Sequence, residues 1–436
     1  MNTVVLGAAG FLGQHVVKLL SDSQRNVLAV VRPGSTHPFD AWGVPTCEVD
    51  LQNAQHVQDV LQTADSVIFC AGRTFVSGMP NAEYQRQNVK LVRSFIEAIE
   101  NRSDIRVVFT SSMSAIAASR IPHPFAGTED RSLSCTDRMS PYDWAKLDCE
   151  RLALDAAERG RNIVILNPGY MLGPLATRQS GLSTTFLVEW FCLQTSPFYI
   201  DGGQSYCDVR DVAAAHVAAL EQGQPGTRYA VGGSNLRTTD FYDELGQVTG
   251  INRPFRVRPL TAWVGAALGD VIQHLSRARL KNEVHRDFVR SLPLFYYADS
   301  RRAEQDLSYQ HRPLQETLLQ TIQSLYEFDR LPTDSFRFVT TMTTENSNRV
   351  LMLKQLANKS NYRQFLLKRF DDIYEICEQN IDLRKALDQS LRLSVFHSRR
   401  GRFEFIDSEH KQHVSVLRRF FEYTWFASDE YLEMMS

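Results

Sequence analysis

The stretch Val4-Val5-Leu6-Gly7-Ala8-Ala9-Gly10-Phe11-Leu12-Gly13 decides how the first half of this chain folds. An apolar run ends at Leu6, glycines follow at every third position, and an amphipathic helical pattern continues to Leu20. Glycine permits a sharp turn from strand to helix and lets the backbone approach a phosphate. The pattern predicts a turn that holds the pyrophosphate of a dinucleotide through Gly7, Ala9, Gly10, Phe11, Leu12 and Gly13. A glycine turn that binds no ligand is the alternative.

The rest of the N-terminal part alternates β-rich runs with helical patterns. Further strands are predicted at Asn26–Val31, Ser66–Cys70, Arg106–Thr110 and Asn162–Leu166, and helices at Phe11–Leu20, Ala82–Glu100 and Tyr142–Arg159. Strands that alternate with helices form a parallel sheet covered on both faces and joined by right-handed crossovers. The predicted fold class is therefore α/β, with a Rossmann-type doubly wound parallel sheet over residues 1–180.

Two further segments are expected after this sheet. Residues 181–332 alternate less regularly and predict a small α/β substrate-binding lobe, parts of which return to the sheet. Its candidate strands are Thr227–Val231 and Phe255–Arg258, and its candidate helices are Val212–Glu221, Thr238–Thr249 and Pro313–Glu327. Residues 336–436 contain almost no glycine and no proline, and predict a separate all-α module of unassigned role. Its helical patterns are Asn346–Asn358, Tyr362–Gln379, Leu383–Phe396 and His410–Met434.

The bulk composition excludes several classes of protein. The chain has 436 residues, 43% of them apolar, and its formal net charge of −2 gives no sign of nucleic-acid binding. No apolar run approaches the roughly 20 residues of a membrane span, and no signal peptide precedes the glycine stretch. The seven cysteines are scattered without Cys-x-x-Cys spacing, and no histidine has the company of a metal site. A cytoplasmic location is expected, because the cysteines predict no disulfides.

The residues after the second, third and fourth strands predict how a dinucleotide would lie. A site selective for NAD usually has an acidic residue after the second strand, bonded to the ribose hydroxyls. Arg32 stands there instead and offers a cation to a 2′-phosphate, so NADP(H) is expected rather than NAD(H). A solvated surface arginine is the alternative. Asp50-Leu51 would flank the adenine, and the small residues Cys70-Ala71-Gly72 would let the cofactor cross the sheet edge.

Three residues suit proton transfer to a carbonyl group. Tyr142 and Lys146 are four residues apart on a predicted helix, so they lie on one face of it. A neighbouring ammonium favours the phenolate form, which lets Tyr142 donate a proton as hydride arrives, and Lys146 could also bond the nicotinamide ribose. Ser112 follows the fifth strand and could polarise the same oxygen. An exposed helical pair is the alternative for Tyr142 and Lys146, and the order of strand, serine and glycine turn argues against it.

These residues make the chain resemble the extended short-chain dehydrogenase/reductase superfamily over about residues 1–328. Within it, the chain is most similar to the dihydroflavonol-4-reductase-like, NAD-dependent epimerase/dehydratase group. The resemblance extends over Asn167-Pro168-Gly169, Asp208-Val209-Arg210-Asp211-Val212-Ala213 and Ala298-Asp299-Ser300-Arg301-Arg302-Ala303. It implies that Asn167, Pro168 and Gly169 reach the nicotinamide and that Asn88 is on the cofactor side of its helix. Asn167 stands where the family commonly has an arginine, and a plain helix-surface amide is the alternative for Asn88.

The leading functional hypothesis is NADPH-dependent reduction of a ketone or aldehyde. A hydrophobic or aromatic substrate is favoured by a mostly apolar candidate lining, whose aromatic residues would fit the core of the lobe equally well. That lining comprises Phe75, Val76, Tyr170, Met171, Phe186 and Tyr206. The second hypothesis is an epimerase, dehydratase or isomerase that acts on a sugar nucleotide or a sterol-like substrate and recycles its hydride. The third is a dinucleotide-sensing scaffold whose C-terminal helices bind a partner or form a homodimer.

Overall fold

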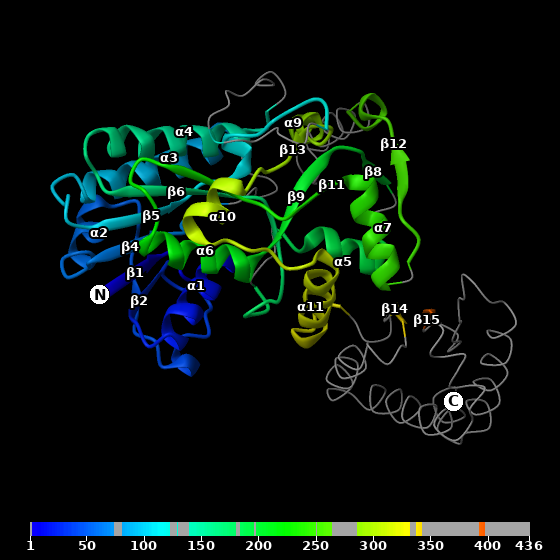
Figure 1. The fold of residues 1–436 in the computed structure, drawn as a ribbon, viewed down its shortest axis with the longest axis horizontal. Helices are drawn as coiled ribbons and strands as arrows, with labels where there is room; N and C mark the ends of the chain where they lie inside the picture. The colour runs from blue at the N-terminus through cyan, green and yellow to red at the C-terminus, as the bar shows by residue number, and fades with distance from the viewer. Residues whose placement is uncertain are drawn as a thin grey trace, which may run out of the picture. The chain divides into compact units, whose positions relative to one another are not determined.

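The computed structural model describes residues 2–73, 81–122, 129, 139–179, 184–195, 198–249, 251–263, 286–331, 337–341 and 392–396 (Figure 1). The chain divides into two compact units. The first comprises Met1–Phe186, Pro197–Phe241 and Pro254–Thr317, and the second comprises Leu187–Ser196, Tyr242–Arg253 and Leu318–Ser436. Every residue that the sequence predicts to bind cofactor or to act in catalysis belongs to the first unit. The domain boundaries at residues 180 and 332 stay predictions.

Seven parallel strands form the central sheet in the order β10-β6-β5-β4-β1-β2-β3. The strands are β1 Asn2–Leu6, β2 Asn26–Val31, β3 Thr46–Glu48, β4 Ser66–Phe69, β5 Arg106–Thr110, β6 Ile163–Pro168 and β10 Arg228–Val231. The sequence order reverses at β1, which pairs with β2 on one side and with β4 on the other. Ligands of open α/β sheets bind at such a reversal, beyond the carboxyl ends of the strands. The predicted doubly wound parallel sheet is confirmed.

Helices pack on both faces of this sheet (Figure 1). One buried cluster, the α1–α6 cluster, receives side chains from α1 (Phe11–Asp22), α6 (Val209–Glu221) and α10 (Arg301–Leu307). The other, the α3–α4 cluster, receives side chains from α2 (Ala54–Val60), α3 (Asn81–Ala98) and α4 (Pro141–Glu158). The predicted helices over Phe11–Leu20, Ala82–Glu100 and Tyr142–Arg159 therefore agree with α1, α3 and α4 to within two residues at each end.

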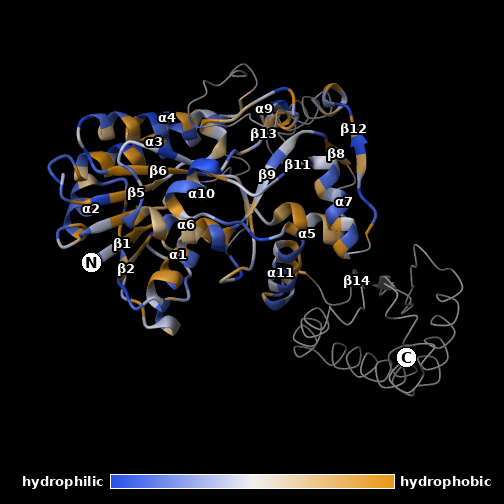
Figure 2. Cartoon of the chain, viewed as in Figure 1, coloured by the Kyte–Doolittle hydropathy of each residue, from blue (hydrophilic) through white to orange (hydrophobic). Residues whose placement is uncertain are grey.

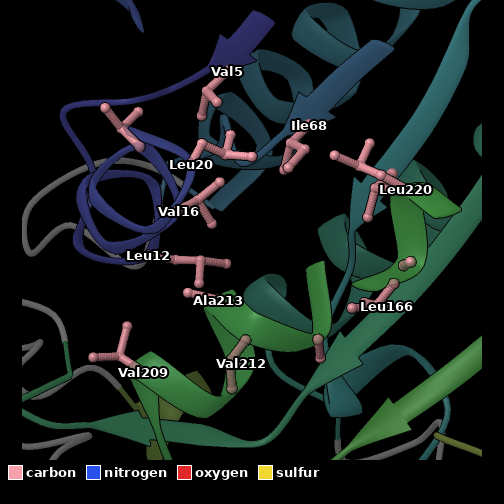
Figure 3. Packing of buried hydrophobic residues seen from close by; sticks show 14 of the residues in the cluster. Val5, Leu12, Val16, Leu20, Ile68, Leu166, Val209, Val212, Ala213 and Leu220 are labelled. Carbon is pink, nitrogen blue, oxygen red and sulfur yellow. The ribbon is translucent and has the colours of Figure 1, made fainter. Parts of the chain in front are cut away.

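The strands are buried on both faces, which explains their continuous apolar runs. Val5 belongs to the α1–α6 cluster, whereas Val4 and Leu6 belong to the α3–α4 cluster, as the two-residue period of a strand requires. Figure 3 shows Leu20 and Val16 of α1 beside strand residues of the first cluster. Figure 2 shows orange, apolar residues on the strands β5 and β6 and both colours on the helices around them. The core thus fixes the strand ends that carry the candidate site.

A smaller set of strands continues from β6. β9 (Gly203–Asp208) lies between β11 (Ser234–Arg237) and β13 (Phe295–Tyr296) and also pairs with β7 (Tyr170–Leu172). β8 (Phe198–Ile200) pairs with β12 (Phe255–Val257), so the predicted strand at Phe255–Arg258 is confirmed. The remaining elements are the short helices η1 Asp40–Trp42 and η2 Met113–Ala115, and the helices α5 Phe186–Leu193, α7 Thr238–Thr249, α9 Arg286–Ser291 and α11 Leu314–Glu327.

The C-terminal prediction needs one correction. β14 (Arg337–Thr341) pairs antiparallel with β15 (Arg392–Phe396), so the helix predicted over Leu383–Phe396 is wrong for its last five residues, and the module is not all-α there. In the sequence Arg392-Leu393-Ser394-Val395-Phe396, polar and apolar residues alternate as far as Val395, which suits a strand. The other three helical patterns of this module lie outside the described residues. In the part of the chain that the structure describes, no helix is both long and apolar enough to span a membrane.

Candidate active site

The glycine turn joins β1 to α1 and packs against two neighbouring strands. Gly7 has a φ of +81°, in the left-handed region, and its N–H donates to the Val30 carbonyl over 3.1 Å. A Cβ on Gly7 would lie 2.6 Å from Ala71 Cα, and a Cβ on Gly13 would collide with the Gly7 carbonyl oxygen. Both positions therefore require glycine, because backbone meets backbone there.

The first turn of α1 is suited to an anion. Gly10 is the N-cap residue, no side chain caps the helix, and no acidic residue lies in its first turn. The N-terminal N–H groups are therefore available to a phosphate, which the positive end of the helix dipole attracts. Gly10 is exposed, and Ala9 and Phe11 are half-buried, whereas Leu12 and Gly13 are buried and could contact a phosphate only through their backbone. The turn fits the pyrophosphate of a dinucleotide.

Two predicted adenosine contacts lie on loops that follow β2 and β3. Arg32 follows β2 with an exposed side chain, and its guanidinium forms no hydrogen bond or ion pair within the described ranges. The exposed Asp50 carboxylate accepts a hydrogen bond from the Gln52 N–H over 3.0 Å, and Leu51 packs against the α3–α4 cluster. Arg32 is thus a cation without a protein partner in the described chain, and Asp50 is partly engaged by its own turn.

The segment after β4 brings three predicted residues together. A Cβ on Gly72 would lie 3.6 Å from the Asn88 side-chain oxygen and 3.8 Å from the Lys146 Nζ. Asn88 Oδ1 accepts the Arg73 N–H over 2.8 Å, and the Asn88 amide nitrogen donates to the Tyr84 carbonyl over 3.1 Å. Asn88 is therefore buried, and its side-chain oxygen holds the backbone of the segment after β4. It is not the plain helix-surface amide that the sequence left as the alternative.

Cys70 lies at the base of the same segment, directly after β4. Its thiol lies 3.5 Å from the Thr110 hydroxyl oxygen at the end of β5, a long hydrogen-bond contact. Burial raises the pKa of the Cys70 thiol to about 12, so the group is a neutral thiol at physiological pH. Cys70 can therefore line a cofactor site without adding a charge to it.

The start of α4 is fixed by a capping box. The Ser140 hydroxyl accepts the Asp143 N–H over 3.3 Å, the Asp143 carboxylate accepts the Ser140 N–H over 2.7 Å, and Pro141 occupies the first helical turn. The Tyr296 hydroxyl also donates to the Asp143 carboxylate over 3.0 Å. Burial raises the pKa of this carboxyl group, and the hydrogen bonds from Ser140 oppose that rise. Tyr142 is thereby held on a rigid first turn.

Tyr142 and Lys146 are both half-buried on α4. Their four-residue spacing places them on one face of the helix. Neither the Tyr142 hydroxyl nor the Lys146 ammonium forms a hydrogen bond or an ion pair with any residue that the structure describes. The buried Tyr84, whose pKa is raised first by burial and then by Tyr142, lies close to the phenol. The described residues thus leave the phenol and the ammonium unengaged, and the ammonium lies close to Gly72.

Ser112 lies two residues beyond β5, at the carboxyl end that the sequence predicted. Its hydroxyl oxygen accepts the Ser114 N–H over 3.2 Å, which leaves the hydroxyl hydrogen available for another acceptor. Its carbonyl oxygen accepts the Ala115 N–H and the Asn167 side-chain amide, each over 3.0 Å. Ser112 is therefore anchored through its backbone, while its hydroxyl can still donate.

Asn167 and Pro168 are the last two residues of β6, and Gly169 follows the strand. Asn167 was expected at the nicotinamide, but its side chain is 0% exposed and its amide nitrogen is used inside the protein. The hydrogen bonds described for the Asn167 amide are all to the protein, and its expected contact with the nicotinamide stays a prediction. Pro168 is also buried, and the half-buried Gly169 approaches β9 so closely that a Cβ would collide with the Ser205 carbonyl oxygen.

Among the proposed substrate contacts, Tyr206 is a core residue. It is buried and stacks on Phe241 with ring centroids 4.0 Å apart. Tyr170 is half-buried and donates its hydroxyl to the Thr184 carbonyl over 2.7 Å. Phe75 and Val76 lie outside the described residues. Tyr206 therefore packs in the core of the lobe and does not line a substrate pocket. The side chain of Tyr170 remains partly exposed to solvent.

Sequence reasoning missed Glu150, a buried carboxylate on α4. It lies one helical turn after Lys146 and two turns after Tyr142, and it is 1% exposed. Its partners include the Ser111 hydroxyl at 2.5 Å and the Arg228 guanidinium at 3.3 Å. The available signal was its position on the same helical face as the other two residues. Its partners are far away in sequence, and only the fold brings them to it.

The fold and this edge of the sheet define a dinucleotide-binding α/β protein with a tyrosine–lysine pair at its ligand edge. Residues 3–232 match the model of the NAD dependent epimerase/dehydratase family. That match covers more than half of the chain, and the chain belongs to this family. The predicted resemblance to the extended short-chain dehydrogenase/reductases is confirmed. The chain is an NAD(P)-dependent oxidoreductase, and its cofactor is a pyridine nucleotide.

Relatives and solved structures agree with this assignment. The chain is 26% identical over 333 residues to a putative dihydroflavonol 4-reductase of Synechocystis sp., covering 73% of this chain and 92% of the relative. It is 25% identical over 345 residues to cinnamoyl-CoA reductase 1 of Petunia hybrida, covering 75% and 93%. The yeast methylglyoxal/isovaleraldehyde reductase Gre2, solved with NADPH, shares the fold with a TM-score of 0.56 at 20% identity, covering 76% and 99%.

Proposed function

We propose that this protein reduces a ketone or an aldehyde with NADPH. The observation that carries the proposal is the unengaged pair of Tyr142 and Lys146 on α4, with Lys146 beside Gly72 at the edge where the strand order reverses. Nothing in the described chain uses the phenol or the ammonium for stability, although both are half-buried. Polar groups held in this way suit a substrate and a cofactor better than they suit the fold. Relatives that are named as reductases support the same chemistry.

The reaction we propose needs one proton and one hydride. The reduced nicotinamide supplies the hydride to the carbonyl carbon when it is bound. Tyr142 gives its hydroxyl proton to the carbonyl oxygen, which produces the alcohol, and Lys146 stabilises the phenolate that remains until water reprotonates it. Ser112 donates a hydrogen bond to the same oxygen and stabilises the charge that develops there. Lys146, next to Gly72, also binds the nicotinamide ribose, and Asn88 holds the Gly72 segment in place.

Selectivity for NADPH is assigned to Arg32. The 2′-phosphate would meet an exposed guanidinium that no described residue neutralises, and such a pair is a charge-assisted hydrogen bond. Asp50 and Leu51 would flank the adenine. We assign the pyrophosphate to the backbone N–H groups of α1, and the nicotinamide to the segment of Cys70, Ala71 and Gly72. A hydrophobic or aromatic carbonyl compound is the proposed substrate class, which the names of the relatives support.

The test is turnover of purified protein with NADPH and a panel of aryl, alkyl and α,β-unsaturated carbonyl compounds. Loss of the reduced-nicotinamide absorbance, with one alcohol formed for each NADPH, is the expected result. The family model also covers epimerases and dehydratases, so sugar nucleotides belong in the panel. Product isomers formed without net consumption of cofactor would replace the reductase proposal with that second function. An intact fold that binds no dinucleotide at all would remove both.

A further inference from the structure

A buried hydrogen-bond network connects α4 to the ends of three neighbouring strands. The Glu150 carboxylate accepts the Ser111 hydroxyl over 2.5 Å and the Asn167 amide over 2.5 Å through one oxygen. Its other oxygen accepts the Arg228 guanidinium over 3.3 Å. Glu150 is 1% exposed and Asn167 is 0% exposed. A carboxylate this deeply buried is tolerable only because three donors, one of them cationic, satisfy it.

The Asn167 amide is shared between this carboxylate and the candidate active site. One nitrogen carries two hydrogens, and Asn167 uses its nitrogen for both Glu150 and the Ser112 carbonyl, the latter over 3.0 Å. Glu150 lies on the helix that carries Tyr142, and Ser112 lies beyond β5. The Asn167 amide therefore links α4, the helix that carries Tyr142, to Ser112.

The network extends further at Arg228, on the neighbouring strand β10. The Arg228 guanidinium also donates to the Glu129 carbonyl, and the Glu129 carboxylate accepts the Ala230 N–H over 2.8 Å. Glu129 itself is buried. Because β10, β6 and β5 are adjacent strands, these bonds brace the sheet across the region where Ser112 emerges.

We propose that Asn167 and Glu150 form a positioning pair that holds Ser112 at the distance from Tyr142 at which both hydroxyls reach one substrate oxygen. The inference rests on the proposed reductase function and adds to it two residues whose described hydrogen bonds are all to the protein. The pair acts on geometry alone. A displacement of about 1 Å at a reacting centre can reduce kcat by about 100-fold, so the network is a rate determinant even though it is remote from the chemistry.

Exchanging the amide of Asn167 and the carboxylate of Glu150 separates an effect on the position of Ser112 from an effect on the stability of the fold. In Asn167→Asp, two carboxylates face each other, so both thermal stability and kcat should fall. The double variant Glu150→Gln with Asn167→Asp restores a hydrogen bond between the two side chains, because the introduced glutamine donates and the introduced aspartate accepts. Stability should return towards that of the wild type. The kcat should stay about 10- to 100-fold low, because the aspartate that replaces Asn167 has no hydrogen to donate to the Ser112 carbonyl.

The measurements are melting temperature, steady-state kinetics and the dissociation constant for NADPH. NADPH affinity should be unchanged in all variants, because the described hydrogen bonds of both side chains are all to the protein. Asp155→Asn is the matched control, since Asp155 is an exposed carboxylate on the same helix and no hydrogen bond or ion pair holds it within the described chain. It should behave as the wild type. Recovery of kcat together with stability in the double variant would refute the positioning role.

Hydrogen exchange at Ser114 and Ala115 tests the inference without substrate. Both N–H groups bond to Ser112, one to its hydroxyl and one to its carbonyl, so their exchange reports how firmly Ser112 is held. Exchange at both should be faster in Asn167→Asp and in the double variant, and unchanged in Asp155→Asn. If wild-type protein reduces no carbonyl compound, the reductase proposal fails, and the exchange result still decides the placement of Ser112. Unchanged exchange in the double variant would overturn the inference.

Discussion

The side-chain oxygen of Asn88 accepts a hydrogen bond of 2.8 Å from the backbone N–H of Arg73. This bond holds Gly72 beside Lys146, where the nicotinamide ribose is proposed to lie. Asn88→Ala should therefore weaken NADPH binding by about 5- to 10-fold, since the loss of one hydrogen bond to a partly buried N–H costs about 1–1.5 kcal/mol. Asn88→Asp keeps the acceptor for the Arg73 N–H but loses the donor to the Tyr84 carbonyl, so it should be less stable than the wild type and retain more NADPH affinity than the alanine variant. Fluorescence titration measures both, and equal affinity in the alanine variant and the wild type would contradict the assigned role.

Tyr142→Phe should abolish the chemistry and spare the fold. The phenol hydroxyl has no hydrogen-bond partner among the described residues, so its removal breaks no bond and should leave the melting temperature unchanged. Loss of the proton donor should lower kcat by about 10²- to 10⁴-fold. Tyr84→Phe is the contrasting variant, because the Tyr84 hydroxyl donates to the Arg73 carbonyl over 2.5 Å. It should lose stability. A Tyr142→Phe variant with ordinary turnover would end the proposed mechanism.

Gly7→Ala should prevent cofactor binding. Its φ of +81° disfavours a side chain, and the new Cβ would meet the Ala71 backbone at 2.6 Å, so the turn must open. Gly160→Ala shares the positive φ of +88° but has nothing within 4 Å of its Cβ. That control should lose about 1–2 kcal/mol of stability and keep its NADPH affinity. Calorimetric titration of both variants compares the two outcomes, and equal loss of affinity would show that backbone strain alone is responsible.

Arg32→Ala should reverse the preference between the two cofactors. Loss of one charge-assisted bond to the 2′-phosphate should raise the KM for NADPH by about 10- to 100-fold and leave the KM for NADH nearly unchanged. Arg93→Ala, at an exposed position on α3, removes the same charge elsewhere and should change neither constant. A wild-type enzyme that already prefers NADH would show that Arg32 is a solvated surface arginine.

His216 should make the fold sensitive to mild acid. It is fully buried, its Nδ1 donates to the Val212 carbonyl over 2.8 Å, and its Nε2 accepts the Thr110 hydroxyl over 2.8 Å. Burial lowers its pKa from 6.5 to about 4. Between these values the unfolded chain binds more protons than the folded one, so stability falls as pH falls from 6.5 towards 4. The slope from this group is at most about 1.4 kcal/mol per pH unit.

Urea unfolding at several pH values measures this contribution. His216→Gln is expected to be less stable than the wild type near neutral pH, and the difference between the two proteins should shrink as the pH falls through the same window. Other titrating groups are common to both proteins and cancel in that difference. A constant difference from pH 7 to pH 4 would show that His216 is not buried in its neutral form.

Local patterns made much of this fold predictable. The glycine turn follows a buried strand and opens an amphipathic helix, and the start of α4 carries its own capping box, so each could be predicted from about ten residues. Ser112 could be located because it follows a β-branched run. Glu150 and Asn167 could not be joined by any local pattern, since they meet only after α4 packs on β6. The resemblance assigned Asn167 to the nicotinamide, but the position of a residue in a motif does not show which way its side chain points.

The strand pair β14–β15 illustrates a different difficulty. Arg392–Phe396 combines apolar residues at a spacing that fits the end of an amphipathic helix and a two-residue alternation at once. Its pairing with Arg337–Thr341, more than fifty residues earlier, decides between them. Short apolar runs of this kind are assigned by their partners and not by their own composition.

The neutral thiol of Cys70 has a consequence for the compounds that this protein can process. Because burial raises its pKa to about 12, Cys70 stays a neutral thiol at neutral pH. Only the thiolate attacks electrophiles at an appreciable rate, so an unsaturated aldehyde beside the nicotinamide would form few covalent adducts with Cys70. If the proposed reductase acts on such compounds, burial of this sulfur would protect it from inactivation by its own substrates.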